Sequence, residues 1–133
     1  MQYLCLIYDD ETAGTRMTRE AGQALMGQYV AFTENIKKSG HYVGGNPLQP
    51  TKTASTVRVR QGKVSTTDGP FAETKEQLAG FYLIEARDLN EAIQLASKIP
   101  PAEVGSIEIR PIRPIRERPR ISGGRDAVDH VGR

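Results

Sequence analysis

Hydrophobic residues form two nearly continuous runs, one at the N-terminus and one beyond the middle of the chain. Residues 2–8 read Gln-Tyr-Leu-Cys-Leu-Ile-Tyr and residues 80–86 read Gly-Phe-Tyr-Leu-Ile-Glu-Ala. Short runs of β-favouring residues without polar alternation are typical of strands buried on both faces. Both segments are therefore predicted to be inner strands of a sheet.

Three further segments have the pattern of strands, either by alternation of apolar and polar residues or by their place after a turn. Residues 57–60 (Val-Arg-Val-Arg) alternate strictly, and residues 63–66 follow them across the turn-forming pair Gln61-Gly62. Together these two segments predict a β-hairpin with one half-exposed strand. Residues 106–110 alternate around Ile107 and Ile109 and predict the last strand.

Two helices are predicted between the strands. Thr18 can cap a helix that runs to Ser39-Gly40, with apolar residues at spacings of four, four, three and four: Ala21, Leu25, Tyr29, Phe32 and Ile36. Asp88 and Glu91 have the spacing of a capping box, and the helix that follows ends before Pro100-Pro101.

The remaining segments carry turn-forming and polar residues. Residues 9–15 predict a polar loop, and the extended stretch that begins at Tyr42-Val43 is expected to break at residues 44–47 (Gly-Gly-Asn-Pro). From Pro111 the chain is rich in Pro, Arg and Gly without a sustained period. We expect one domain over residues 1–112 and an Arg/Pro/Gly-rich tail over residues 113–133.

The predicted order is β-α-β, a hairpin, then β-α-β, which is a ferredoxin-like α+β plan. Such a sheet carries its helices on one face. The runs at 3–8 and 81–86 leave no polar pattern for the opposite face. A second sheet would cover that face, so the sequence predicts a homodimer.

Composition narrows the class of protein. The chain has 133 residues and a net charge of +2, and residues 113–133 contain six arginines against three acidic residues. The body is therefore close to neutral, and no specific nucleic-acid binding is expected. No run is long enough to span a membrane, and the N-terminus lacks signal-peptide features, so a cytoplasmic location is predicted. The single cysteine, Cys5, is interpreted as a buried filler, with a reactive thiol as the alternative.

The densest chemistry lies in residues 67–76 (Thr-Asp-Gly-Pro-Phe-Ala-Glu-Thr-Lys-Glu). Asp68 and Glu73 are candidate general acids or bases, and Lys75 is a candidate for stabilising a developing oxyanion. A structural interpretation stands beside this one. Asp-Gly-Pro-Phe is also a sufficient rigid turn, and three charges in four residues are also typical of a solvated face.

Five other residues complete the candidate site. Arg58 and Arg60 share one strand face that suits an anionic group, and Glu76 and Tyr82 are placed at the mouth of a cavity. His41 can titrate near neutrality and is a candidate acid or base. Tyr29 is a further cavity candidate. For each of them an exposed strand face, a structural role or core packing is the alternative. No metal cluster, phosphate loop or dinucleotide motif is visible, so no cofactor is expected.

Several segments match a known family. Residues 67–76 followed by Gly80-Phe81-Tyr82 resemble the signature of YCII-related proteins of the DGPF type. Residues 3–8, 45–50, 56–60 and 109–112 are also similar to that family. The resemblance covers residues 2–112.

The resemblance implies a dimeric α+β barrel from a bacterium, largely of uncharacterised function. Some broader relatives are thought to use a His–Asp pair with its histidine in the first helix, and one is a dehydrochlorinase. Residues 18–39 hold no histidine, and Gln28 and Tyr29 stand near the expected place. Many DGPF-type proteins are encoded beside extracytoplasmic-function sigma factors.

Two functions follow as hypotheses. The first is a cofactor-independent enzyme, of lyase or isomerase type, that acts on a small organic molecule in a dimer cavity. The second is a non-enzymatic regulatory or partner protein, linked to extracytoplasmic-function sigma factors and using the tail at 113–133.

Overall fold

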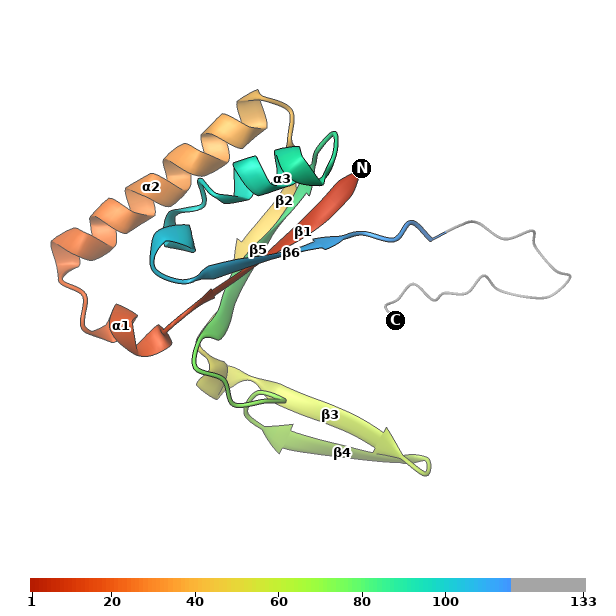
Figure 1. The fold of residues 1–133 in the computed structure, drawn as a ribbon. Helices are drawn as coiled ribbons and strands as arrows, with labels where there is room; N and C mark the ends of the chain where they lie inside the picture. The colour runs from red at the N-terminus through yellow and green to blue at the C-terminus, as the bar shows by residue number, and fades with distance from the viewer. Residues whose placement is uncertain (116–133) are drawn as a thin grey trace, which may run out of the picture.

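A four-stranded antiparallel sheet forms the centre of the molecule (Figure 1). The computed structural model describes residues 1–115. The sheet has the order β2-β5-β1-β6, with β1 (Gln2–Asp9), β2 (Tyr42–Pro47), β5 (Gln77–Glu85) and β6 (Ser106–Pro111). The two predicted inner strands, β1 and β5, pair from Gln2 opposite Glu85 to Asp9 opposite Gln77. The ferredoxin-like α+β plan is confirmed.

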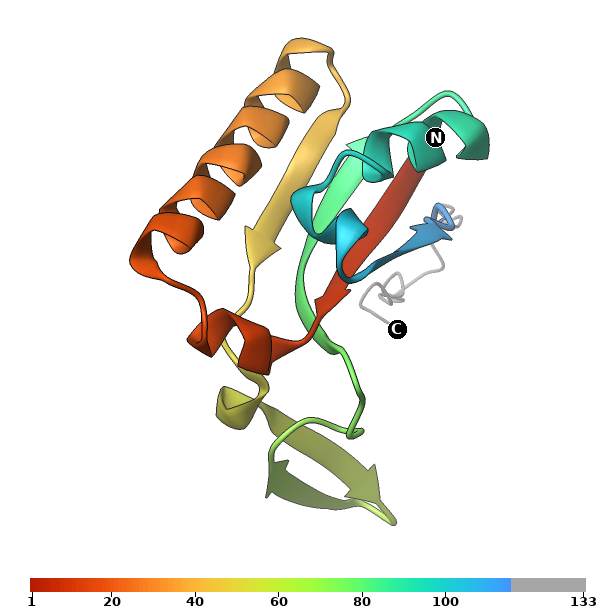
Figure 2. The ribbon, with the colours of Figure 1, turned by 60° about the vertical axis from the view of Figure 1, so that its left-hand side comes forward.

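Two helices cover one face of this sheet (Figures 1 and 2). In α2 (Arg19–Lys38), Thr18 is the N-cap and its hydroxyl accepts a hydrogen bond from the Ala21 amide. In α3 (Leu89–Ala96), Asp88 is the N-cap and accepts from the Glu91 amide. These predicted caps satisfy amide groups that a helix leaves unpaired at its start.

The core lies between the sheet and the two helices. Alternate residues of β1 point into it, and Cys5 is completely buried. Burial raises the pKa of its thiol to about 11, so the interpretation of Cys5 as a core filler is confirmed. The other buried apolar side chains come from the same strands, from the helices and from the segment after α3: Tyr3, Ile7, Phe32, Ile36, Tyr82, Ile84, Ala86, Ala92, Ala96 and Ile99.

The opposite face of the sheet is also apolar at its centre. The register pairs Leu4 with Leu83 and Leu6 with Phe81, and these side chains alternate with the buried ones. All four are only partly buried, because no helix lies over this face in the described residues (Figure 2). We call these four residues the open sheet face.

The predicted hairpin forms a separate two-stranded sheet, which we call the arm. Its strands are β3 (Ser55–Arg60) and β4 (Lys63–Asp68), and it extends away from the central sheet (Figure 1). Gln61 and Gly62 both take positive φ at its turn, of 53° and 77°, as a two-residue hairpin turn of type I′ requires. Valine side chains at positions 57, 59 and 64 are exposed along it.

Two sequence predictions were wrong. The stretch that begins at Tyr42 does not break at Gly-Gly-Asn-Pro, because β2 continues through these residues to Pro47. An edge strand tolerates proline, and glycine permits the bulge that the register shift between Tyr42 and Gly44 marks. Residues 9–15 are not all loop, since α1 (Glu11–Thr15) forms behind an N-cap at Asp10.

The connections add two short 3₁₀ turns, η1 (Thr51–Thr53) and η2 (Pro100–Glu103). Among residues 1–115, no helix combines the length and the hydrophobicity needed to cross a membrane. The predicted tail at 113–133 lies outside the described residues, apart from its first three positions.

Candidate functional site

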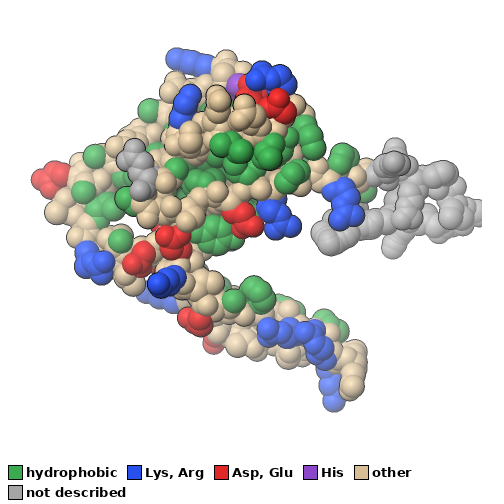
Figure 3. Space-filling view, in the orientation of Figure 1, with side chains coloured by type: hydrophobic (Ala, Val, Ile, Leu, Met, Phe, Trp, Pro, Cys, Tyr) green, Lys and Arg blue, Asp and Glu red, His purple; other side chains and the backbone are tan. Residues whose placement is uncertain are grey.

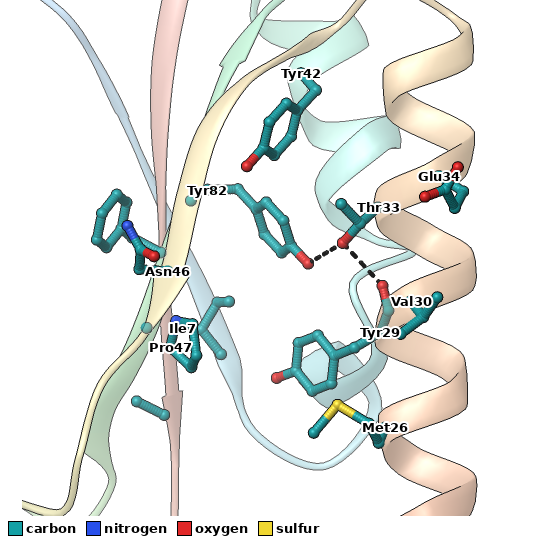
Figure 4. Close-up of a pocket in the computed structure, with 14 residues that line it drawn as sticks. Ile7, Met26, Tyr29, Val30, Thr33, Glu34, Tyr42, Asn46, Pro47 and Tyr82 are labelled. Atoms are coloured by element: carbon teal, nitrogen blue, oxygen red, sulfur yellow. Dashed lines mark hydrogen bonds between the residues drawn. The ribbon is translucent and has the colours of Figure 1, made fainter.

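A pocket of about 410 Å³ lies between α2 and the half of the sheet formed by β2 and β5 (Figure 4). We call it the α2 pocket. Its walls are mostly apolar, and its size falls within the range of natural small-molecule sites. It is lined by Ile7, Met26, Tyr29, Val30, Thr33, Glu34, Tyr42, Gly45, Asn46, Pro47, Ala79, Gly80, Phe81 and Tyr82.

Helix spacing and glycine together shape the pocket. Met26, Tyr29 or Val30, and Thr33 recur every three or four residues, so they share one face of α2. On the sheet side, a Cβ atom at Gly45 would lie 2.8 Å from both the Phe81 carbonyl oxygen and the Tyr82 ring. The absence of that atom lets the Tyr82 ring lie against β2.

Four hydroxyl-bearing residues line the pocket, and three of them, Tyr29, Thr33 and Tyr82, are linked through Thr33. The hydroxyls of Tyr82 and Thr33 are 2.7 Å apart, and the Thr33 hydroxyl donates to the Tyr29 carbonyl oxygen at 2.9 Å. Figure 4 shows Tyr82 reaching from the sheet toward α2 and Tyr29 reaching from α2 toward the sheet. Within residues 1–115 the Tyr29 hydroxyl has no hydrogen-bond partner.

Burial keeps both phenols protonated. It raises the pKa of Tyr29 to about 12, with smaller contributions from nearby Asp9 and Tyr82. Burial is also the main cause that raises the pKa of Tyr82. At neutral pH both side chains are therefore uncharged hydrogen-bonding groups rather than bases.

Asp9 is a partly buried carboxylate whose charge contributes to the raised pKa of Tyr29. Asp9 ends β1, and burial raises its pKa, with further contributions from the carboxylates of Glu76, Glu11 and Asp10. Glu11 is held in place, because its carboxylate accepts from the Thr51 amide at 2.8 Å and from the Thr51 hydroxyl at 2.6 Å. A carboxyl group with a raised pKa next to a pocket is a candidate acid or base.

The structure separates the residues that the sequence nominated. Tyr29 and Tyr82 line the α2 pocket, whereas the other seven candidates do not. Arg58, Arg60 and Asp68 are exposed on the arm, and Glu73 and Lys75 are exposed in the loop that follows it. In a single chain, Asp68, Glu73 and Lys75 therefore do not share a pocket with Tyr82.

Glu76 and His41 occupy opposite ends of the central sheet. Glu76 accepts from the Ser106 hydroxyl at 2.8 Å and contributes to the raised pKa of Asp9. His41 follows α2, with Nδ1 at 2.7 Å from the Ser39 hydroxyl and Nε2 at 3.4 Å from the Glu91 carboxylate. These contacts join the end of α2 to α3.

Sequence reasoning missed Thr33 and Asp9. Thr33 lies four residues after Tyr29 on the same helix face, so helix spacing places it near that candidate. Asp9 had a weaker signal, as the first acidic residue after an apolar strand. Its proximity to Tyr29 depends on how α2 packs on the sheet.

No group of three or more His, Cys, Asp or Glu side chains in residues 1–115 is arranged to hold a metal ion. The lining of the α2 pocket contains hydroxyls, one amide and the Glu34 carboxylate, but neither lysine nor arginine. The arrangement can bind an uncharged organic molecule and exchange hydrogen bonds with it.

Comparisons with known proteins identify the family of this chain. The model of the YCII-related domain matches residues 1–116. An uncharacterised protein of Rhizobium meliloti (strain 1021) is 38% identical over 114 residues, which span 84% of this chain and 92% of that protein. On both grounds, the chain belongs to the YCII-related family.

Proposed function

We propose that this protein binds a small organic molecule in the α2 pocket and acts on it by cofactor-independent acid–base chemistry of the lyase or isomerase type. The observation that carries the proposal is the pocket itself. It is largely apolar, about 410 Å³ in volume, and has a small number of hydroxyl groups directed into it. Sites of this form bind small molecules in many proteins.

Asp9 is the acid–base group that this proposal favours. Asp9 does not line the pocket, but its own pKa is raised and its charge contributes to the raised pKa of Tyr29, which does line it. Tyr29, with a pKa of about 12, serves as a hydrogen-bond donor to the substrate and stays protonated.

The acidic and basic residues of the segment 68–75 remain a second proposal for the catalytic groups. Asp68, Glu73 and Lys75 are exposed and lie outside the α2 pocket of their own chain. For them to act, a second copy must bring them to a pocket, so this proposal depends on a dimer.

Filling the pocket tests the binding function. Val30 lines the pocket and its side chain is 54% exposed, so Val30→Trp places an indole at the opening. We expect ligands found by a thermal-shift or ligand-observed NMR screen of the wild type to lose at least about tenfold in affinity. A change of that size corresponds to roughly 1.4 kcal/mol.

Gln28→Trp is the matched control for this test. Gln28 is exposed on α2, does not line the pocket and lies about half a turn around the helix from Val30. The same ligands should bind this variant as they bind the wild type. Equal binding to Val30→Trp and the wild type, or no ligand for the wild type in a broad screen, would overturn the proposed function.

We also propose that two copies associate through the open sheet face. Leu4, Leu6, Phe81 and Leu83 form adjacent apolar pairs at the centre of an uncovered sheet. Burying such a face removes apolar surface from water and stabilises association. Light scattering measures the mass in solution, and a monomeric wild type at micromolar concentration contradicts this proposal.

The alternative function, a regulatory partner linked to sigma factors, relied on the tail at 113–133. That tail lies outside the described residues except for its first three positions. The pocket favours the small-molecule function. A cytoplasmic location remains a prediction of the sequence.

A further inference from the structure

The α2 pocket carries information about what it binds, because its hydrogen-bonding directions are fixed. The Thr33 hydroxyl has a single proton. That proton is donated to the Tyr29 carbonyl oxygen at 2.9 Å. With the Thr33 proton engaged there, we assign the donor across the 2.7 Å contact between the Thr33 and Tyr82 hydroxyls to Tyr82.

This assignment leaves the Tyr82 oxygen as an acceptor. Its proton is engaged, and its remaining lone pair is open to a donor from the pocket. The Tyr82 ring is held in this position by edge-to-face contacts with Phe32 and Tyr42, at centroid distances of 5.1 and 6.4 Å. The direction of the acceptor is thus set before any ligand binds.

The Tyr29 hydroxyl supplies the complementary group. Among residues 1–115 it has no hydrogen-bond partner, and its pKa of about 12 keeps it protonated. Both phenols line the same pocket, and Thr33 contacts both the Tyr82 hydroxyl and the Tyr29 backbone carbonyl. The pocket therefore offers a free donor and a directed acceptor near each other.

The charges around the pocket disfavour an anion. Its lining has no lysine, arginine or histidine, and it includes Glu34 at the opening, with Asp9 near Tyr29. The nearest cation on α2, Lys37, lies over the Tyr42 ring at 5.1 Å from its centroid. Transfer of an unpaired carboxylate into such an apolar site is costly.

We propose that the ligand of the α2 pocket is an uncharged, mainly apolar molecule with a hydroxyl group, a phenol or an alcohol, that donates to Tyr82 and accepts from Tyr29. This inference rests on the proposed function, since it names the class of molecule that the same pocket takes. A hydroxyl fits because it is both a donor and an acceptor, whereas a ketone is only an acceptor and a carboxylate carries a charge.

Four naphthalene probes test the proposal on the intact protein. They are naphthalene, 2-naphthol, 2-acetylnaphthalene and 2-naphthoate, which share one ring system and differ in the polar group. We expect 2-naphthol to bind at least about fivefold more tightly than each of the other three, as one or two hydrogen bonds imply. Isothermal titration or ligand-observed NMR measures the four affinities.

Two tyrosine variants locate the effect. Tyr29→Phe and Tyr82→Phe should each bring the affinity for 2-naphthol about fivefold closer to that for naphthalene, while naphthalene itself binds as before. Circular dichroism and thermal melting show whether each variant is folded. An unchanged ratio in both folded variants overturns the proposal.

Thr33→Val tests the hydrogen-bond direction through a change in ligand preference, which a purely structural role of Thr33 would not produce. It removes the acceptor of the Tyr82 proton and nearly preserves the side-chain volume, so Tyr82 becomes free to donate into the pocket. We expect this variant to gain affinity for 2-acetylnaphthalene relative to 2-naphthol. A ratio equal to that of the wild type contradicts the assigned hydrogen-bond direction.

The outcomes distinguish a wrong hydroxyl preference from a wrong proposed function. If 2-naphthoate or naphthalene binds the wild type as tightly as 2-naphthol, and Val30→Trp weakens that binding, the proposed function stands and the hydroxyl preference is wrong. If none of the four probes binds, the hydroxyl preference is wrong and the broad ligand screen decides the proposed function. If Val30→Trp leaves the binding of the probes unchanged, both proposals fail.

Discussion

Neighbouring carboxylates at the end of β1 have opposite electrostatic environments. Burial and the charges of Glu76, Glu11 and Asp10 raise the pKa of Asp9. Hydrogen bonds from the hydroxyl and amide of Thr12 lower the pKa of Asp10, which caps α1. The folded protein therefore disfavours the ionised form of Asp9 and favours the ionised form of Asp10.

This contrast predicts the effect of Asp9→Asn. The pKa of Asp9 is higher in the folded state than in the unfolded state. Its contribution to the free energy of unfolding is therefore fully present below the unfolded-state pKa and is lost as the pH rises through the folded-state pKa. Near neutral pH, Asp9→Asn replaces the ionised carboxylate with a neutral amide. It should therefore raise the free energy of unfolding by on the order of 0.5 kcal/mol. The gain should disappear as the pH falls below the pKa of Asp9. Urea denaturation at several pH values measures it.

Asp10→Asn is the control of opposite sign. The lowered pKa of Asp10 means that its carboxylate stabilises the fold above the unfolded-state pKa, and that this stabilisation is lost as pH falls. Asp10→Asn should therefore not stabilise the protein near neutral pH. If Asp9→Asn lowers the free energy of unfolding at that pH, the assignment of Asp9 as a strained charge is wrong.

At the scale of the element, β2 shows how an irregular sequence forms a regular strand. Gly44 and Gly45 occupy consecutive positions beside the bulge, and only one of them is closely approached. A Cβ at Gly45 would meet the Phe81 carbonyl oxygen at 2.8 Å, whereas a Cβ at Gly44 has nothing within 4 Å. The two glycines therefore have different roles.

Alanine substitutions distinguish them. Gly45→Ala should lower the free energy of unfolding by about 2 kcal/mol, because backbone and the Tyr82 ring must move to accept the methyl group. Gly44→Ala should change it by less than about 0.5 kcal/mol. Chemical denaturation of the two variants measures the difference, and similar losses for both would contradict the close approach at Gly45.

At the scale of the whole molecule, the arm presents two chemically different faces. Direct cross-strand pairs share a face, so Val59 and Val64 lie together, and Arg60 and Lys63 lie together on the other side. Figure 3 shows hydrophobic and basic side chains along the arm. Val57, Val59 and Val64 are 60%, 56% and 69% exposed, although an isolated two-stranded hairpin is marginally stable in water.

We expect the valine face of the arm to contact the second copy in the proposed homodimer. The double variant Val59→Thr/Val64→Thr keeps β-branched side chains and removes apolar surface. We expect it to raise the dimer dissociation constant by at least about tenfold, the equivalent of roughly 1.4 kcal/mol. Sedimentation equilibrium measures that constant. Arg58→Thr, on the opposite face, should have little effect.

The sedimentation results decide which surface, if any, forms the dimer contact. A wild type that sediments as a monomer rules out association through either surface. A dimer whose dissociation constant is equal in the wild type and the valine variant places the contact on the open sheet face alone. A larger effect of Arg58→Thr would assign the contact to the basic face instead.

Much of the fold follows directly from the sequence. Apolar runs identified β1 and β5 as inner strands, the spacing from Ala21 to Ile36 identified α2, and Thr18 and Asp88 identified the helix starts. These signals are local, because a helix or strand repeats its buried side at a fixed period. The family resemblance, confirmed by the match over residues 1–116, is a property of the same residues.

The site followed from the sequence only in part. Tyr82 was nominated and lines the α2 pocket, but the charged segment at 68–76 contributes nothing to that pocket in its own chain. A cluster of polar residues in a sequence is as typical of an exposed turn as of a functional site. The role of Tyr82 depends on Thr33, which is 49 positions away in the sequence.

What the sequence by itself determined is therefore most of the elements, their order and the family. Only the tertiary structure decided that β2 continues through Gly45, that the hydroxyls of Thr33 and Tyr82 lie 2.7 Å apart, and that the charge of Asp9 acts on Tyr29. The physical reason is that each of these depends on contacts between α2 and distant strands. Such contacts follow from packing, which no local period in the chain encodes.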